Sequence, residues 1–225
     1  MKHMKPTKKL ITLLFIFGII ITGGILFSTA GSFKYWNAWV FIGVLFIPFL
    51  FSALYFSRKK PKLLERRMKF EEKESQQKLI IKLANLIFFL GLLVPGLDYR
   101  FGWSNISNFF VIFSNVMIFI GYLIVFFAFR ENSYASRIIE VEKKQKVIAT
   151  GPYSVIRHPM YFGVALMFLF MPLALGSYPA LVFFIPVIIL LIFRILNEED
   201  VLLRDLKGYK KYTKKVKYRI IPYVW

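Results

Sequence analysis

The chain has 225 residues, of which 57% are hydrophobic, and it includes 26 phenylalanines. A soluble domain of this size averages about 45 to 50% apolar residues, so the composition excludes an ordinary soluble domain and predicts a membrane protein. The formal net charge is +19 at pH 7, with no cysteine and two histidines. Disulfides, thiolate metal sites and cysteine nucleophiles are therefore excluded, and we expect no histidine metal centre.

Six stretches are apolar enough to cross a membrane as helices, a crossing that takes about 20 residues. In chain order they cover residues 10–29, 38–56, 79–97, 109–129, 160–175 and 179–196. The first is longer than the apolar region of a usual signal peptide, so we expect a retained helix. The last two are short and nearly contiguous, which predicts a tight antiparallel hairpin. The predicted fold is all-α, a polytopic membrane helical bundle with a short C-terminal hairpin and an amphipathic tail.

Basic residues predict the orientation of this bundle, because lysine and arginine in short loops stay on the cytoplasmic side. If the N-terminus lies inside, the cytoplasmic segments are 1–9, 57–78, 130–159 and 194–225. These four segments hold 28 of the 31 lysines and arginines. We therefore expect a protein of the cell inner membrane with both termini in the cytoplasm. The charge also attracts anionic lipid head groups, and no nucleic-acid partner is needed to explain it.

One membrane domain spanning residues 1–225 is the simplest organisation. It divides into four N-terminal helices, residues 1–129, and a loop, hairpin and tail, residues 130–225. The loop at 58–78 mixes charges at helical spacing, which is typical of a connector on the membrane surface or of a lid over a site. On pattern alone, the tyrosines and lysines between Leu206 and Val216 predict an interfacial amphipathic helix with snorkelling lysines.

Charges at the two ends of the hairpin are unusual for helix termini. Pro159 fits the first turn of a helix, so Arg157 and His158 lie at an electropositive N-terminus. The carboxylates of residues 198–200 are expected to follow the last helix, at an electronegative C-terminus. Because the hairpin is antiparallel, these groups meet on one face. Either they neutralise each other, or they frame a zwitterion whose ammonium faces Glu198.

Three motifs in this region carry a family resemblance: "VIATGPYSVIRHPMYFG" at 147–163, "RILNEEDVLL" at 194–203 and "GYKKYTKKVKYRIIP" at 208–222. Together they resemble the C-terminal signature of the isoprenylcysteine carboxyl methyltransferase and phospholipid methyltransferase superfamily of integral membrane enzymes. The similarity covers roughly residues 130–222 and includes "ENSYAS" at 131–136. The chain departs from the family pattern in "LKGYKKY", which is one residue shorter after the glutamates.

The resemblance implies S-adenosylmethionine as methyl donor, bound within the bundle near the cytoplasmic face. The donor contacts that it implies are Gln145, Lys146, Val147 and Ile148 through the main chain, Tyr153 beside the adenosine, the helix mouth of His158, Pro159, Met160 and Tyr161, Glu198 on the ammonium, and Glu199 beside it. Arg194 matches the position that addresses the acceptor. His158 is the one imidazole in the motif. It is expected either to contact the methyl donor or to act as a base for an amine acceptor.

The resemblance implies transfer of a methyl group to a lipid or lipidated acceptor, either an isoprenylcysteine-type carboxylate or a phospholipid-type amine. Two alternatives stay open. The end of the chain, "YTKKVKYRIIPYVW", also resembles the C-terminus of NADPH-dependent sterol reductases, although these usually have Asn-Tyr where this chain has residues 158–161. A non-catalytic lipid-binding membrane protein could also retain the hairpin.

Overall fold

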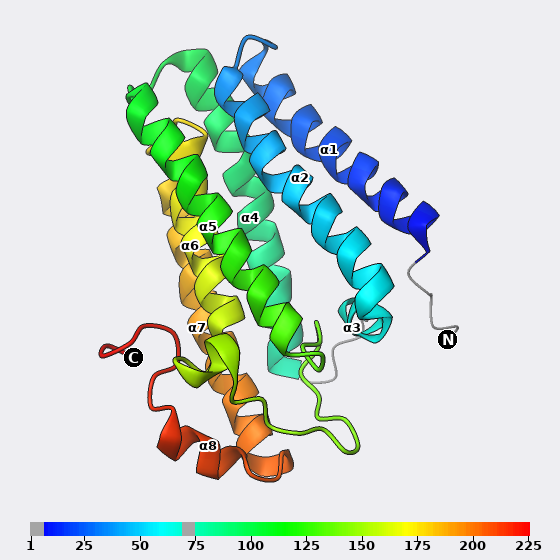
Figure 1. The fold of residues 1–225 in the computed structure, drawn as a ribbon. Coiled ribbons are helices and arrows are strands. Elements are labelled where there is room, and N and C mark those ends of the chain that lie inside the picture. The colour runs from blue at the N-terminus through cyan, green and yellow to red at the C-terminus, as the bar shows by residue number, and fades with distance from the viewer. Residues whose placement is uncertain (1–6, 69–74) are drawn as a thin grey trace.

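The structure, a computed structural model, describes residues 7–68 and 75–225, and all regular secondary structure within them is helical. The elements are α1 Lys8–Ala30, α2 Trp36–Lys59, α3 Pro61–Arg67, α4 Ser75–Phe101, α5 Asn108–Glu131, the short 3-10 helix η1 Gly151–Ser154, α6 Pro159–Ala174, α7 Leu181–Asp205 and α8 Tyr209–Lys215. The long helices form one bundle, from which α1 and α2 lean away (Figure 1). The predicted all-α class is confirmed.

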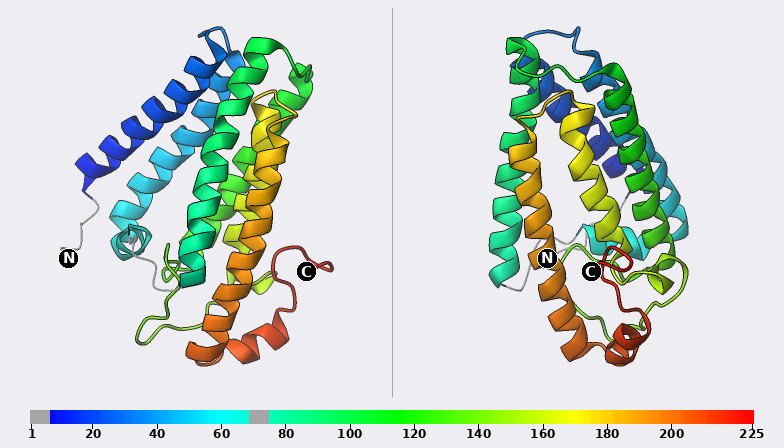
Figure 2. Two further views of the ribbon diagram at one scale, coloured as in Figure 1. Left: turned by 180° about the vertical axis from the view of Figure 1, so that it is seen from behind. Right: turned by 90° about the vertical axis from the view of Figure 1, so that its left-hand side faces the viewer.

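Five of the described helices, α1, α2, α4, α5 and α7, are long and apolar enough to cross a membrane. The sixth predicted span corresponds to α6, which is apolar but has only 16 residues. It lies in the bundle beside α5 and α7, as Figure 2 shows. The predicted hairpin is present, with α6 and α7 joined by residues 175–180.

The packed core lies toward the end of the bundle that holds the loops 31–35, 102–107 and 175–180. Its fully buried members come from several helices and loops and include Leu26, Phe41, Ile118, Ala174 and Phe184. A buried carboxylate reinforces this end, because Asp98 accepts hydrogen bonds from Ser104 Oγ at 2.7 Å and Ser177 Oγ at 2.6 Å. These bonds tie the end of α4 to the α6–α7 hairpin.

Helices α5 and α6 approach each other closely at two glycines. A Cβ atom added to Gly121 would lie 2.7 Å from the carbonyl oxygen of Gly163, and one added to Gly163 would lie 2.5 Å from that of Gly121. Small residues at such crossings let membrane helices pack backbone to backbone. This close crossing fixes the position of α6 against α5, and with it the position of the residues at the N-terminus of α6.

The predicted end of the last membrane helix at residue 196 is wrong, because α7 continues to Asp205. Glu198, Glu199 and Asp200 therefore lie inside a helix rather than after it, and the helix-dipole argument does not apply to them. The helix continues because its last turns are still amphipathic. Val201 is buried there and Leu202 packs against the tail, while Leu203 is exposed.

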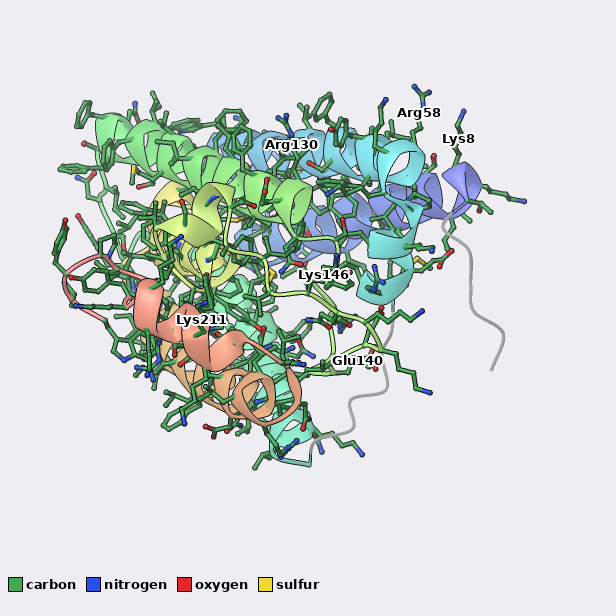
Figure 3. The ribbon with its side chains drawn as sticks, turned by 60° about the horizontal axis from the view of Figure 1, so that its bottom comes forward. Lys8, Arg58, Arg130, Glu140, Lys146 and Lys211 are labelled. Carbon is green, nitrogen blue, oxygen red and sulfur yellow. The ribbon has the colours of Figure 1, made fainter. Side chains whose placement is uncertain are left out.

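The opposite end of the bundle gathers the basic segments. Helices α3 and α8 and the loop 132–158 lie there (Figure 1). Figure 3 views this end, around which Lys8, Arg58, Arg130, Lys146 and Lys211 are distributed. Of the loop predicted at 58–78, residues 61–67 form α3, and residues 69–74 lie outside the described residues. α3 docks on the loop 132–158, because Arg66 pairs with Glu142 at 2.6 Å.

Candidate functional site

Glu199 is the centre of a buried ion-pair cluster at the start of α6. Its side chain accepts hydrogen bonds from Arg157 Nε at 2.6 Å and Arg219 Nε at 2.6 Å, and its Oε1 lies 3.2 Å from His158 Nε2. The residue is only 3% exposed. The cluster joins α6, α7 and the C-terminal segment, so Glu199 neutralises the cations that the sequence places at the helix N-terminus.

Main-chain bonds hold the C-terminal segment in the same place. The amide of Arg157 donates to the carbonyl of Tyr218 at 2.9 Å, and the amide of His158 donates to that of Arg219 at 2.8 Å. Arg157 Nη1 also donates to the carbonyl of Val216 at 2.9 Å. The orientation of His158 is thereby fixed, because its amide donates to the carbonyl of Arg219 and its ring lies beside Glu199.

Beside this cluster lies a cavity, which we call the motif cavity. It is lined by the loop 132–148, η1, the start of α6, α7 and α8. Its lining includes residues 145–148 and, from the other predicted donor contacts, Tyr153, His158, Met160, Tyr161 and Glu198. The predicted residues thus come together from the loop, η1 and the helices α6 and α7, although they are separated by up to about fifty positions in the sequence.

Two predicted donor contacts lie outside this lining. Pro159 is buried as the first residue of α6, where a proline needs no amide partner. Glu199 points into the ion-pair cluster instead of the cavity. Each interpretation of the hairpin charges therefore fits one of the two glutamates. Glu199 neutralises Arg157, whereas Glu198 faces the cavity.

The loop 132–148 is shaped by its own side chains. Asn132 Oδ1 accepts a hydrogen bond from the amide of Tyr134 at 2.9 Å, which makes a turn within "ENSYAS". Gln145 Oε1 accepts one from the amide of Glu142 at 3.0 Å. The side chain of Gln145 is therefore engaged in closing its own turn. Gly151 has a positive φ of 55°. Glycine adopts this left-handed conformation without steric strain, so the chain can turn into η1 there.

A chain of hydrogen bonds leads from the motif cavity to Arg194. Tyr161 Oη donates to Glu198 Oε2 at 2.5 Å, and Arg194 Nε donates to Tyr161 Oη at 3.0 Å. Glu198 is half-buried, and among the described residues only Tyr161 donates a hydrogen bond to it. One oxygen of this carboxylate is therefore free to meet a bound cation in the cavity.

Arg194 itself lines a second space, which we call the lateral groove. Its walls are mostly apolar side chains of α4, α5, α6 and α7, among them Ile81, Phe88, Val125, Phe168 and Leu190. Arg67, Arg137 and Arg194 also line it. Met160 and Tyr161 belong to the lining of both spaces. The motif cavity and the lateral groove therefore meet at these two side chains.

Residues 109–208 match the family model of the phospholipid methyltransferases. Over these residues the chain is similar to the phospholipid methyltransferase family. The matched region runs from the first turn of α5 to the residue before α8 and contains most of the lining of the motif cavity. The predicted resemblance to the integral membrane methyltransferase superfamily is confirmed. No curated protein matches the chain.

Phospholipid methyltransferases are membrane methyltransferases that act on lipid, and the helical bundle and the lateral groove of this chain agree with that activity. The family match favours methyl transfer over the two alternatives, the sterol-type reductase and the non-catalytic lipid-binding protein. It does not extend to α1–α4, so Arg67 of the lateral groove comes from outside the matched region.

The tail contributes cavity residues that the sequence did not predict. Tyr209 and Tyr212 are buried, line the motif cavity and pack with Val216 against Val147 and neighbouring residues. Burial raises the pKa of both phenols, so they remain neutral hydroxyls at physiological pH. The spacing of three and four residues between these apolar side chains was the available signal, since it puts them on one helix face. That face covers the cavity instead of lying on a membrane.

Proposed function

We propose that this protein transfers a methyl group from S-adenosylmethionine to an amphiphilic acceptor that reaches the donor from within the bilayer. The observation that carries the proposal is the meeting of the motif cavity and the lateral groove at Met160 and Tyr161. One space is lined by polar, charged and apolar side chains and is bordered by the tail. The other is mostly apolar and lies between helices. A polar donor and a lipid acceptor could therefore come together at one point.

The chemistry of the motif cavity fits this donor. S-adenosylmethionine carries an ammonium, a carboxylate, a sulfonium and an adenosine. The half-buried carboxylate of Glu198 suits the ammonium, and the aromatic rings of Tyr153, Tyr209 and Tyr212 suit the apolar face of the adenosine. Lys146 also lines the cavity and could pair with the donor carboxylate. The cavity thus offers a carboxylate and a lysine for the two charges of the zwitterion, and tyrosine rings for its aromatic base.

When bound, the donor supplies an electrophilic methyl group for in-line displacement. The protein must then align the nucleophile with that methyl group and exclude water, and such alignment can contribute about 7 to 11 kcal/mol. Glu198 and the loop 145–148 would hold the donor, and Tyr209 and Tyr212 would cover it. Displacement at a sulfonium carbon requires no covalent enzyme intermediate, so no nucleophilic side chain is needed.

Acceptor chemistry decides whether a base is needed. A carboxylate is already ionised, whereas an amine must first lose its proton. Tyr161 lies between the two spaces and donates to Glu198, which gives a route for that proton toward a carboxylate. Arg194, hydrogen-bonded to the same hydroxyl, can orient an acceptor carboxylate or disfavour a protonated amine.

Binding of S-adenosylhomocysteine and of NADPH to purified protein in detergent tests the donor assignment. We expect the wild type to bind S-adenosylhomocysteine and not NADPH. Glu198→Gln should weaken binding at least about thirtyfold, since it leaves a buried ammonium without its counterion, a loss of about 2 to 5 kcal/mol. Asp200→Asn, an exposed carboxylate on the same helix, is the matched control and should bind like the wild type. Equal affinity in both variants would contradict the assignment.

A further inference from the structure

A further cavity lies at the end of the bundle opposite the basic segments, and we call it the loop-end cavity. Its volume is about 170 Å³, and it is lined by residues of the loops 31–35, 102–107 and 175–180 and of the adjoining ends of α2, α4 and α5. The three loops lie at the same end of the bundle (Figure 1). Among the described residues, none that lines this cavity also lines the motif cavity or the lateral groove. It is therefore a separate space.

Asp98 brings a negative charge to the loop-end cavity. The residue is 1% exposed, and its carboxylate accepts hydrogen bonds from neutral donors, the amide and hydroxyl of Ser104 at 2.7 Å and the hydroxyl of Ser177 at 2.6 Å. Within residues 7–68 and 75–225, no lysine, arginine or histidine forms an ion pair with it. The next basic residue in α4, Arg100, is exposed and lies beside Gly31. Because a buried carboxylate without a cation costs free energy, a bound cation would stabilise this end.

Asn37 has hydrogen-bonding groups that the protein leaves unused. It is the second residue of α2, is 9% exposed and lines the cavity, yet its side chain forms no hydrogen bond with any described residue. Its amide lies close to Gly176, where an added Cβ atom would be 2.9 Å from Asn37 Nδ2. Buried polar side chains nearly always have a hydrogen-bond partner. An amide that lacks one at the wall of a cavity indicates a ligand that supplies it.

The chemistry of the lining indicates which kind of cation fits. The rings of Tyr35 and Tyr99 stack with their centroids 4.6 Å apart, and both line the cavity beside Trp36. Aromatic faces attract organic cations, and the ends of α4 and α6 are electronegative. A calcium ion takes six to eight oxygen ligands, and the described residues contain no cluster of metal-ligating side chains. An ammonium with N–H groups can instead pair with Asp98 and donate to the oxygen of Asn37.

The position of the cavity favours a lipid as the source of this ammonium. Exposed aromatic side chains surround this end of the bundle: Trp36, Trp39, Phe101, Trp103 and Tyr178. Such residues gather at the level of the lipid head groups. Helices α2 and α5 also begin beside the cavity, since their first residues, Trp36 and Asn108, line it. Helix N-termini suit a phosphate, which is the group next to the ammonium in a zwitterionic head.

We propose that the loop-end cavity binds a primary ammonium group, with Asp98 as its counterion and Asn37 as a hydrogen-bond acceptor. The group comes from an aminophospholipid head or from a soluble amine of the same chemistry. Bound there, it would link the loop 31–35, the end of α4 and the α6–α7 hairpin. The site lies at the opposite end of the bundle from the motif cavity, so the proposal does not depend on methyl transfer.

Short-chain phospholipids that differ only in the head test the site. Dihexanoyl phosphatidylethanolamine carries a primary ammonium, the matching phosphatidylcholine a quaternary one, and the matching phosphatidylglycerol none. Their binding to purified protein in a neutral detergent can be measured by calorimetry. We expect phosphatidylethanolamine to bind at least about tenfold more tightly than the other two, a difference of about 1.4 kcal/mol. Binding of either other lipid as tightly as phosphatidylethanolamine would overturn the proposal.

Variants locate this preference, because an amine head could also enter the lateral groove as a methyl acceptor. Asp98→Asn and Asn37→Ala should each lose most of it. Glu198→Gln, in the motif cavity, and Asp205→Asn, an exposed carboxylate paired with Arg204, are the controls and should keep it. A full preference in Asp98→Asn would overturn the proposal. If that variant does not fold, Asn37→Ala decides in the same way, since its side chain has no hydrogen bond to lose.

Two further ligands identify the source of the cation and test for a metal. Ethanolamine that binds more than about tenfold more weakly than phosphatidylethanolamine would identify a lipid head group as the ligand, and ethanolamine within tenfold would identify a soluble amine. Calcium chloride is the metal control, and we expect it to bind more weakly than ethanolamine. Calcium that binds more tightly than ethanolamine, with its binding lost in Asp98→Asn, would overturn the ammonium site in favour of a metal site.

Discussion

At the residue scale, two neighbouring glutamates in one motif have different environments. Successive residues of a helix point about 100° apart, so Glu199 enters the ion-pair cluster with Arg157 and Arg219 while Glu198 faces the motif cavity. The sequence predicted that both carboxylates belong to the site. It could not assign them separately, because the partner Arg219 comes from a tail whose path depends on tertiary packing.

Glu199→Gln should destabilise the folded protein more than Glu198→Gln does. Removing the charge leaves the buried guanidinium of Arg157 and the partly exposed one of Arg219 without a counterion, and breaking a buried pair costs about 3 to 5 kcal/mol. The free energy of unfolding, measured by denaturant titration in mixed micelles, checks this. Asp205→Asn, which breaks the exposed pair with Arg204, is the control and should change stability by less than about 1 kcal/mol. A loss for Glu199→Gln no larger than the control's would contradict a structural role.

At the element scale, the sequence predicted the apolar helices well, because about 20 consecutive apolar residues leave a membrane segment few alternatives. It predicted the helices less well where they extend beyond the apolar stretches. The end of α7 and the course of α8 depend on contacts of Leu202, Tyr209 and Tyr212 with the loop 132–158, and no local pattern records those contacts. The same limit applies to α3, whose docking depends on Arg66 and Glu142.

The crossing of α5 and α6 should be sensitive to one added methyl group. Gly163→Ala would bring a Cβ atom within 2.5 Å of the Gly121 carbonyl, and such overpacking costs about 1 to 3 kcal/mol. Because Tyr161 lies in α6 and His158 directly precedes it, the affinity for the methyl donor should fall together with stability. Gly24→Ala is the matched control, since an added Cβ meets nothing within 4 Å there. Equal unfolding free energies for the two variants would show that the close approach is not required.

At the scale of the whole molecule, the motif cavity and the lateral groove lie near the basic segments at one end of the bundle, which we call the functional end. At the other end, the loops at 102–107 and 175–180 pack around Asp98. The distribution of basic residues predicts that the functional end faces the cytoplasm. A donor made in the cytoplasm could then enter the motif cavity directly.

Single cysteines can test this orientation, because the chain has none of its own. Asn105→Cys lies in an exposed loop at the end that holds Asp98, and Lys146→Cys lies in the loop at the functional end. A membrane-impermeant maleimide should label Asn105→Cys in intact cells and Lys146→Cys only after the membrane is opened. The reverse pattern would invert the predicted topology.

Methyl transfer by purified protein tests the central claim most directly. Wild type, Glu198→Gln and Asp200→Asn would be incubated in bilayers of total lipid extract with S-adenosylmethionine carrying a labelled methyl group, and the label in lipid would then be counted and identified. We predict labelled lipid with the wild type and Asp200→Asn, and at least about tenfold less with Glu198→Gln at a donor concentration near the wild-type dissociation constant. Label that stays in water-soluble products, or labelled lipid that does not depend on Glu198, would contradict the account.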